Sequence, residues 1–593
     1  TNPSPSGPAT IMPSETAPPA TPTATPTPTP VPTNAPDPVD ALLSRMTVDQ
    51  RIGQLLMPYA YGASATSVTA AQRSANRQIY GVDTPAELVS RYHLGGLILL
   101  PRNTLHPTLD KLPTENTTDP TRVPALTDGL QHAALNDSGV PLLIATDQEE
   151  GLVTRIGEPL AVFPGSMPLG ATRDQELARR VAAATGSEMA ALGVNLDLAP
   201  DADVNVEPRN PVIGLRSFGD DAQLVAGMVT AQVAGYQQDA GIGATVKHFP
   251  GHGDTTVDSH TGLPRISHDR ATLQAVDLPP FASAITNGVD VVMAGHLLVP
   301  ALDPNQPATL SSTILTDLLR SQLGFKGVVM TDSLWMAGIR SRVKTDADAA
   351  LDAFRAGADI LLMPPAIAAT VARFHAALDG GQISESRLNA SVRRILALKQ
   401  RLGLLDAGWR PSAAMPPGRQ LAADRQLADQ AAAAATTLVA CGSRIDVSAA
   451  TLVIGLGRSA ADLAAALPDA RAIAVDFSPT ATQRQAAVAA AGSARTVVLL
   501  TYDAGASAAQ RQLLASLAAL NVSLVAVSID LPYDLAVSGA ADVRIATYGA
   551  GPVSMRGLAT ALGANRFGGR LPVTVPAGGD PSLAFGAGLP SCG

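Results

Sequence analysis

Eight short apolar runs, about 30 to 50 residues apart, place the strongest limit on the fold of this chain. They are LLMPY near residue 55, GGLILL near 95, PLLIATD near 141, VNLDLAP near 194, GATVKHF near 243, VDVVMAGH near 289, GVVMTD near 327 and ADILLM near 358. Continuous apolar runs are typical of parallel strands buried on both faces. The segments between them, such as residues 175–193, have the spacing of amphipathic helices. This alternation predicts an α/β fold with a (β/α)8 barrel over residues 41–405.

Polar or ionisable residues follow most of these runs at the point where each predicted strand ends. They are Arg102 and Asn103, Asp147, Asp201 and Asp203, Lys247 and His248, His296, and Asp332. In a (β/α)8 barrel the carboxyl ends of the strands meet on one rim, and that rim carries the chemistry. The sequence therefore predicts a functional site there.

Composition and charge exclude several classes of protein. The chain has 593 residues, 46% of them hydrophobic, which predicts two or more domains. The net charge of −9 and the lack of a Lys/Arg-rich block exclude nucleic acid as the expected partner. No uninterrupted apolar run approaches the roughly 18 residues of a transmembrane helix, so none is predicted.

The two ends of the chain differ in character. Residues 1–40 are rich in Pro and Thr and predict a disordered tether, which we interpret as the stalk of an exported, extracellular or cell-surface protein, with lipid anchoring left open. After a linker at 406–420, strand-like runs near residues 451, 471, 496, 522 and 543 predict a second α/β domain, a sandwich, over 421–593. Cys441 and Cys592 form either one disulfide or two free thiols. The GLGRSA segment lacks a full G-x-G-x-x-G motif, so no nucleotide cofactor is predicted.

The segment KHFPGHGDTTVDSH, residues 247–260, holds three of the nine histidines. A metal site is the first alternative, with His248, His252, Asp258 and His260 as ligands. However, the Pro–Gly breaks prevent a helix from presenting histidines at i and i+4. An Asp-x-His pair on a loop favours proton transfer instead, because the aspartate orients the imidazole and raises its basicity.

This segment, together with residues 213–218 (IGLRSF) and 331–334 (TDSL), resembles the exo-β-N-acetylglucosaminidase branch of glycoside hydrolase family 3, a two-domain family with a TIM-like barrel. The resemblance covers residues 41–405 and implies a retaining mechanism. It implies that Asp332 is the nucleophile and that His260, oriented by Asp258, is the acid/base. It also implies that Asp147, Arg216, Lys247 and His248 bind the terminal sugar, and that neither a metal nor an organic cofactor is needed.

Two departures from the family pattern stand out. The loop after the third predicted strand usually reads Asp-Gln-Glu-Gly-Gly-Arg, whereas this chain has Glu150 and Leu152 at the fourth and sixth positions. The C-terminal segment FGGRLPVTVP, residues 567–576, resembles the second domain of two-domain members. Because the loop carrying Asp258 and His260 already supplies the acid/base, that domain is expected to act as a scaffold or to line the site.

The resemblance therefore implies hydrolysis of terminal N-acetylglucosamine from peptidoglycan or chitin fragments. Two rivals keep the fold: a phosphorylase in which phosphate replaces water, and a β-glucosidase. A rival from another class is an inactive cell-wall carbohydrate-binding protein, which gives no physical reason for keeping Asp332, Asp258 and His260 together. Substrate-assisted catalysis is a mechanistic alternative. The leaving-group sugar and the oligomeric state stay open.

Overall fold

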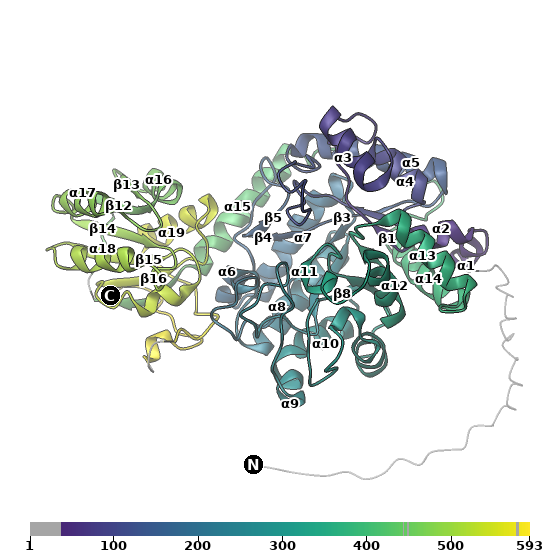
Figure 1. Cartoon of the computed structure of the whole chain (residues 1–593). Coiled ribbons are helices and arrows are strands. Elements are labelled where there is room, and N and C mark those ends of the chain that lie inside the picture. Colours follow the sequence, from purple (N-terminus) through teal and green to yellow (C-terminus); the bar gives the residue numbers. More distant parts are fainter. Residues whose placement is uncertain (1–36, 443, 448–449, 577–579, 593) are drawn as a thin grey trace, which may run out of the picture.

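The computed structural model describes residues 37–442, 444–447, 450–576 and 580–592 as two lobes joined by a long helix (Figure 1). The predicted tether lies almost wholly outside these residues, and helix α1 (Pro38–Leu43) begins within its last positions. Within the described residues, no helix combines the length and apolar character needed to cross a membrane.

All eight apolar runs contain strands of the first lobe, and neighbouring strands run parallel. Six form one curled sheet in the order β2 (Gly96–Ile98), β3 (Leu143–Thr146), β6 (Leu196–Asp197), β7 (Gly243–Phe249), β8 (Val291–Ala294) and β9 (Val328–Thr331). The remaining two, β1 (Leu56–Met57) and β10 (Leu361–Leu362), pair with each other. Backbone contacts join this pair to both edges of the sheet, through the Met330–Ile360 bridge and the hydrogen bond from Ile98 N to Pro58 O.

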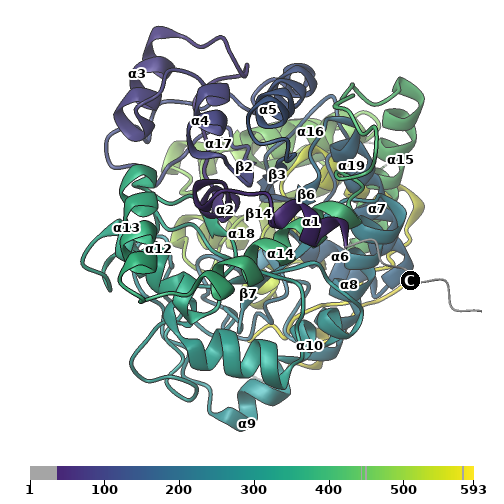
Figure 2. The same ribbon diagram turned by 90° about the vertical axis from the view of Figure 1, so that its right-hand side faces the viewer.

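Helices surround this sheet, as Figure 2 shows from the side of the first lobe. They include α4 (Pro85–Tyr92), α5 (Val123–Asp137), α7 (Gln175–Ala191), α8 (Ala222–Ala234), α10 (Pro279–Thr286), α12 (Asp346–Ala356), α13 (Ile367–Asp379) and α14 (Glu385–Arg401). Many begin at a side-chain cap, and Asp174 accepts from Leu177 N at the start of α7. The predicted amphipathic helix at 175–193 is thus confirmed.

A short helix precedes strand β1. It is α2 (Val48–Gln54), with Thr47 as its N-cap and Gln50 completing a capping box. It ends early because Leu56 and Met57 pair with Leu361 and Leu362 as strand β1.

The second lobe contains a six-stranded sheet. Its order is β11 (Thr437–Cys441), β16 (Val543–Ala546), β15 (Ser523–Ser528), β14 (Thr496–Thr501), β12 (Thr451–Leu456) and β13 (Arg471–Val475), and only β11 is antiparallel to its neighbour. Helices α16 (Gly457–Ala466) and α19 (Pro552–Ala564) pack on one face. Helices α17 (Ala481–Ala491) and α18 (Ala508–Ala518) pack on the other. The five predicted strands are present, and β11 is an additional strand that the sequence did not reveal.

Two features connect the lobes. Helix α15 (Gly418–Ala435) packs against α6 (Ser166–Thr172) of the first lobe and α19 of the second. An apolar cluster joins Met167 and Leu215 to Tyr548 and Leu571.

Within the second lobe, a disulfide joins Cys441 to Cys592 with 5.5 Å between their Cα atoms. Of the two alternatives for these cysteines, one disulfide or two free thiols, the structure therefore has the disulfide.

Candidate active site

A cavity of about 180 Å³ opens at the carboxyl ends of the parallel strands. It is lined by side chains in or just after strands β2, β3, β4, β7 and β9, among them Asn103, Asp147, Glu149, Lys247, His248, His260 and Asp332, together with Arg216 from the loop after β6. Six of the seven predicted site residues therefore meet at one place. The seventh, Asp258, does not line the cavity but contacts it through His260.

One wall of the cavity is a buried network of two carboxylates and two cations. Lys247 Nζ donates to Asp147 Oδ1 at 2.8 Å and lies 2.7 Å from Glu149 Oε1. Arg216 donates to both oxygens of Glu149, from Nε at 2.7 Å and from Nη2 at 2.8 Å. Such two-point pairs fix both partners in position.

The charges of this network are mutually stabilised. Burial by itself would raise the pKa of Glu149, but the neighbouring Arg216 and Lys247 hold it well below its usual range. Burial would likewise lower the pKa of Lys247, but Asp147 and Glu149 raise it. Glu149, Lys247 and Arg216 therefore stay ionised at neutral pH. The network presents fixed charges that can form charge-assisted hydrogen bonds with hydroxyl groups.

Lys247 and His248 are adjacent in β7 yet both line the cavity. In a regular strand successive side chains point to opposite faces. Here the pairing of β7 with β8 is irregular between Val246 and Phe249, which allows both side chains to face the same side.

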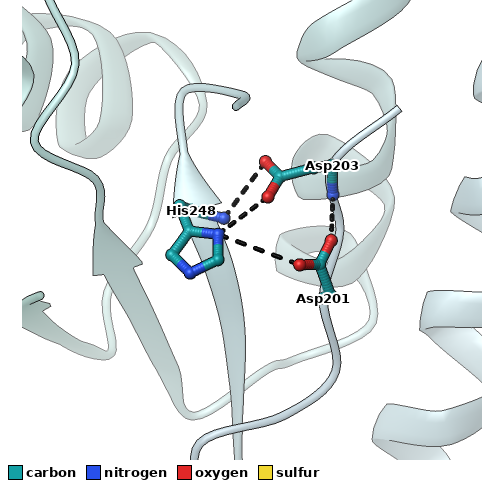
Figure 3. Close-up of side chains that lie close together, drawn as sticks. All are labelled: Asp201, Asp203 and His248. Atoms are coloured by element: carbon teal, nitrogen blue, oxygen red, sulfur yellow. Dashed lines mark hydrogen bonds and ion pairs between the residues drawn. The ribbon is translucent and has the colours of Figure 1, made fainter. Parts of the chain in front are cut away.

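His248 is held by the aspartates that follow β6, as Figure 3 shows. Its Nδ1 lies 2.7 Å from Asp203 Oδ2, and its backbone N–H donates to Asp203 Oδ1 at 3.2 Å. Its Nε2 lies 3.3 Å from Arg216 Nη2. Because a guanidinium can only donate, Nε2 acts as the acceptor and Nδ1 carries the proton.

Asp201, Asp203 and His248 also form a group whose ligand atoms all lie within 4.8 Å of one another. Three features explain this group without an ion. His248 Nδ1 donates to Asp203, the N–H of Asp203 donates to Asp201 Oδ1 at 2.9 Å, and Arg216 Nη2 lies 3.7 Å from Asp201 Oδ2. A cation placed here would compete with the His248 proton and with the Arg216 charge, so we assign no metal to this group.

Asp332 directly follows β9, and its Oδ1 accepts from Ser333 N at 2.6 Å. Burial would raise the pKa of this carboxyl, but His248, His296 and His260 around it hold the pKa below its usual range. The group is therefore an ionised carboxylate facing the cavity. His296, which the sequence left without a role, is buried with its Nε2 2.9 Å from Ser333 O.

His260 stands on an exposed loop at the mouth of the cavity. Its Nδ1 lies 2.7 Å from Asp258 Oδ1, and its backbone N–H donates to the same oxygen at 2.8 Å. The loop contacts the turn after Asp332, because Ala337 N donates to His260 O and Gly338 N donates to Ser259 O, each at 3.3 Å. With Nδ1 bound to Asp258, Nε2 is the ring atom left to exchange a proton with a ligand.

One protein family matches most of the first lobe. Residues 47–398, more than half of the chain, match the N-terminal domain of glycosyl hydrolase family 3. The chain belongs to glycosyl hydrolase family 3. The resemblance inferred from the sequence motifs is thereby confirmed.

Individual family 3 relatives agree with this assignment. β-Hexosaminidase A of Pseudoalteromonas piscicida is 41% identical over 343 residues, which are 54% of this chain and 55% of that protein. A β-N-acetylglucosaminidase/β-glucosidase of Cellulomonas fimi is 36% identical over 279 residues, 45% of this chain and 48% of that protein. The matched region thus spans about half the length of these relatives.

A solved structure covers more of the chain. The family 3 β-N-acetylglucosaminidase from Paenibacillus sp. str. FPU-7 superposes with a TM-score of 0.77 at 35% sequence identity. The match covers 90% of this chain and 99% of that one, so it includes both lobes.

The structure explains how this family 3 chain accommodates Glu150 where the family usually has glycine. Glu150 has φ = 68°, a left-handed conformation that favours glycine. Its carboxyl group is buried and accepts from Phe163 N at 2.9 Å and from Gln148 Nε2 at 3.0 Å. These bonds compensate for the backbone conformation. Glu150 therefore points away from the sugar site and braces the β4–β5 hairpin (Gln148–Glu150 and Val153–Thr154).

Sequence reasoning missed Glu149 and assigned no role to Asp203. A signal for Glu149 was present, because it lies two residues after Asp147 and so shares its side of an extended chain. Asp203 stood out only as one of the polar strand ends. Arg216 was predicted to bind sugar, and it does line the cavity. However, its donors are engaged by Glu149 and by Val212 O, so it also holds Glu149 in place.

Proposed function

We propose that this protein is a retaining, exo-acting β-N-acetylglucosaminidase. The observation that carries the proposal is that one cavity is lined by both the ionised Asp332 carboxylate and the imidazole of His260, which is hydrogen bonded to Asp258. A retaining glycosidase needs a nucleophile and a proton-transfer group at the same sugar. The Paenibacillus structure is that of a β-N-acetylglucosaminidase, and the Pseudoalteromonas relative is a β-hexosaminidase; both support N-acetylglucosamine as that sugar.

The proposed reaction has two steps. First, Asp332 attacks the anomeric carbon while His260 Nε2 gives its proton to the departing glycosidic oxygen, leaving a glycosyl–aspartate ester. Then the neutral His260 takes a proton from water, which attacks the same carbon and releases Asp332. Asp258 keeps the Nδ1 proton of His260 in place and stabilises the imidazolium form that donates the proton from Nε2.

The buried network supplies sugar recognition. Asp147, Lys247 and His248 offer both acceptors and donors to the hydroxyl groups of one terminal sugar. A sugar lacking a hydroxyl would leave a buried charged group without its partner, and this discriminates strongly. The small volume of the cavity, about 180 Å³, supports binding of a single sugar unit and therefore exo-action.

A β-glucosidase activity is the second candidate, because the Cellulomonas relative is named for both activities. The proposal also covers the substrate source and the architecture. We propose that the substrates are peptidoglycan or chitin fragments and that the protein is exported. We further propose that residues 41–405 form a complete (β/α)8 barrel and residues 421–593 a sandwich domain. The Cys441–Cys592 disulfide supports export, since disulfides persist in oxidising compartments.

The test is the initial rate of cleavage of p-nitrophenyl β-N-acetylglucosaminide and of the matching β-glucoside, with and without inorganic phosphate. We expect the N-acetylglucosaminide to be cleaved faster and free N-acetylglucosamine to be the product. Formation of N-acetylglucosamine 1-phosphate would instead identify a phosphorylase, and a faster β-glucoside would identify a glucosidase. Binding of N-acetylglucosamine without turnover of either substrate would indicate a carbohydrate-binding protein.

A further inference from the structure

A second cavity, of about 460 Å³, lies between the two lobes and shares no lining residue with the active-site cavity. One wall comes from the first lobe, through the tip of the β4–β5 hairpin and residues 158–164. The other comes from the linking helix α15 and from the start of α16 and α19 in the second lobe. Its volume falls within the range of small-molecule sites.

The first-lobe wall is apolar. Leu152, at the tip of the hairpin, is 64% exposed, the most exposed large hydrophobic side chain of the described residues. It lines the cavity together with Leu160 and Phe163, and Val553 faces them from α19. Leu152 stands where the family usually has arginine, so this chain has replaced a charge with an apolar surface. A ligand that covers Leu152 would remove that surface from water.

The opposite rim is cationic. Arg425, Arg458 and Arg556 line the cavity, with Glu158 as its one acidic lining residue. Arg556 is paired with Asp429 at 2.8 Å, and Arg425 donates to Pro159 O, so Arg458 is the arginine of this rim best placed to meet a ligand. The Arg458 side chain is 82% exposed, and its nearest acidic partner, Asp462, is 3.6 Å away. Its guanidinium is therefore available to an incoming anion.

Backbone amides add to this charge. Residues 548–551 (YGAG) lead into α19, whose N-cap is Gly551 and which has no side-chain cap; α16 has none either. Ser459 Oγ donates to Ala550 O at 2.8 Å and so holds the two helix starts together. Within the described residues, the N–H groups of Ala550, Gly551 and Val553 have no protein acceptor. Free amides at a helix start attract negative charge.

We propose that this cavity binds a small amphiphilic anion, a carboxylate joined to an apolar group the size of a short acyl chain. The carboxylate lies between Arg458 and the free amides at the start of α19. The apolar part lies against Leu152, Phe163 and Val553. The ligand contacts both lobes at once, and its binding does not depend on the glycosidase activity.

Calorimetric titration of the full chain with octanoate tests this proposal, with 1-octanol and octyltrimethylammonium as neutral and cationic analogues. We expect one octanoate per chain with a Kd below about 1 mM, and binding at least about tenfold weaker for both analogues. Arg458→Glu and Leu152→Asp, both at exposed positions, should each weaken octanoate binding at least about tenfold. Arg471→Glu is the matched control, because Arg471 is also exposed but lies at the opposite end of the sheet.

Two results would overturn the proposal. One is the absence of binding heat at about 10 mM octanoate. The other is equal octanoate affinity in the wild type, Arg458→Glu and Arg471→Glu, which would place binding elsewhere. Arg458→Glu should cleave the chromogenic N-acetylglucosaminide at the wild-type rate, so a folding defect in that variant would be detected separately.

Discussion

The carboxylate of Glu149 lies 2.7 Å from the ammonium group of Lys247, and both side chains are only 2% exposed. Each would be costly to bury alone, and the pair persists because Arg216 and Asp147 complete the network. The sugar site therefore depends on a residue that never needs to touch the reacting atoms.

Substitution Glu149→Gln should thus damage both stability and recognition. Removing the charge leaves Arg216 and Lys247 partly uncompensated, which typically costs about 3 to 5 kcal/mol for a buried pair. We expect a lower unfolding midpoint in denaturant and a raised KM. Asp147→Asn is the comparison, since the Asp147 side chain is 19% exposed and water can compensate there. Equal stability of the two variants would contradict the importance assigned to Glu149.

Asp332→Asn should abolish turnover while leaving the fold intact. An amide of the same shape cannot form the glycosyl ester, so we expect kcat for the chromogenic substrate to fall by at least about a hundredfold. Trapping with a 2-fluoro glycosyl donor should label Asp332 in the wild type, and mass spectrometry of the digested protein would locate the adduct. Asp317→Asn, at an exposed position of the same lobe, is the control. The absence of any adduct would favour substrate-assisted catalysis.

His260→Ala should slow cleavage by an amount that depends on the leaving group of the substrate. A sugar leaving group needs a proton, so cleavage of a disaccharide should fall by about 10²- to 10⁴-fold, the usual contribution of acid catalysis. A dinitrophenyl leaving group needs none, so the first step should survive and a burst of dinitrophenol should precede slow turnover. Asp258→Asn should give a smaller loss of the same kind. A uniform loss on both substrates would indicate that His260 only shapes the cavity.

Glu150 makes stability dependent on pH. Burial raises the pKa of Glu150 to about 7, above its unfolded value near 4.3. Between these two pH values the folded state binds the Glu150 proton more tightly than the unfolded state does. The contribution of this group to the free energy of unfolding is therefore fully present below about pH 4 and is lost as pH rises through 7. We expect Tm of the wild type to fall more steeply between pH 5 and 8 than Tm of Glu150→Gln. Parallel curves would show that the carboxyl titrates normally.

Loss of the disulfide should weaken the second lobe. Cys441 and Cys592 are 151 residues apart, so their bond restricts a long loop of the unfolded chain. The double variant Cys441→Ala/Cys592→Ala should lose about 2 to 5 kcal/mol of stability. Differential scanning calorimetry with and without reductant measures this. Reductant should lower the transition of the wild type and leave the variant unchanged, and insensitivity of both would argue against the bond.

The local pattern of the sequence was enough to predict the strands and where their polar ends meet. Continuous apolar runs indicate strands that are buried on both faces, and parallel strands bring their carboxyl ends to one edge of the sheet. Asp147, Lys247, His248 and Asp332 can therefore be assigned to one site from the order of residues alone. The motif around His260 added the proton-transfer pair, because its two members are only two residues apart.

Strand β11 could not be predicted in this way. It exists because Thr437–Cys441 can pair with Val543–Ala546, about a hundred residues later, and no local periodicity reports such a pairing.

Tertiary structure alone decided which charges compensate each other. Glu149 meets Arg216 across 67 residues, and Lys247 meets Asp147 across 100. Whether Glu150 would enter the sugar site or turn away from it depended on Phe163, which supplies the N–H that holds its carboxyl group. Periodicity determines which face of an element is buried, but the partner of a buried charge is determined by distances between elements, which only the folded chain defines.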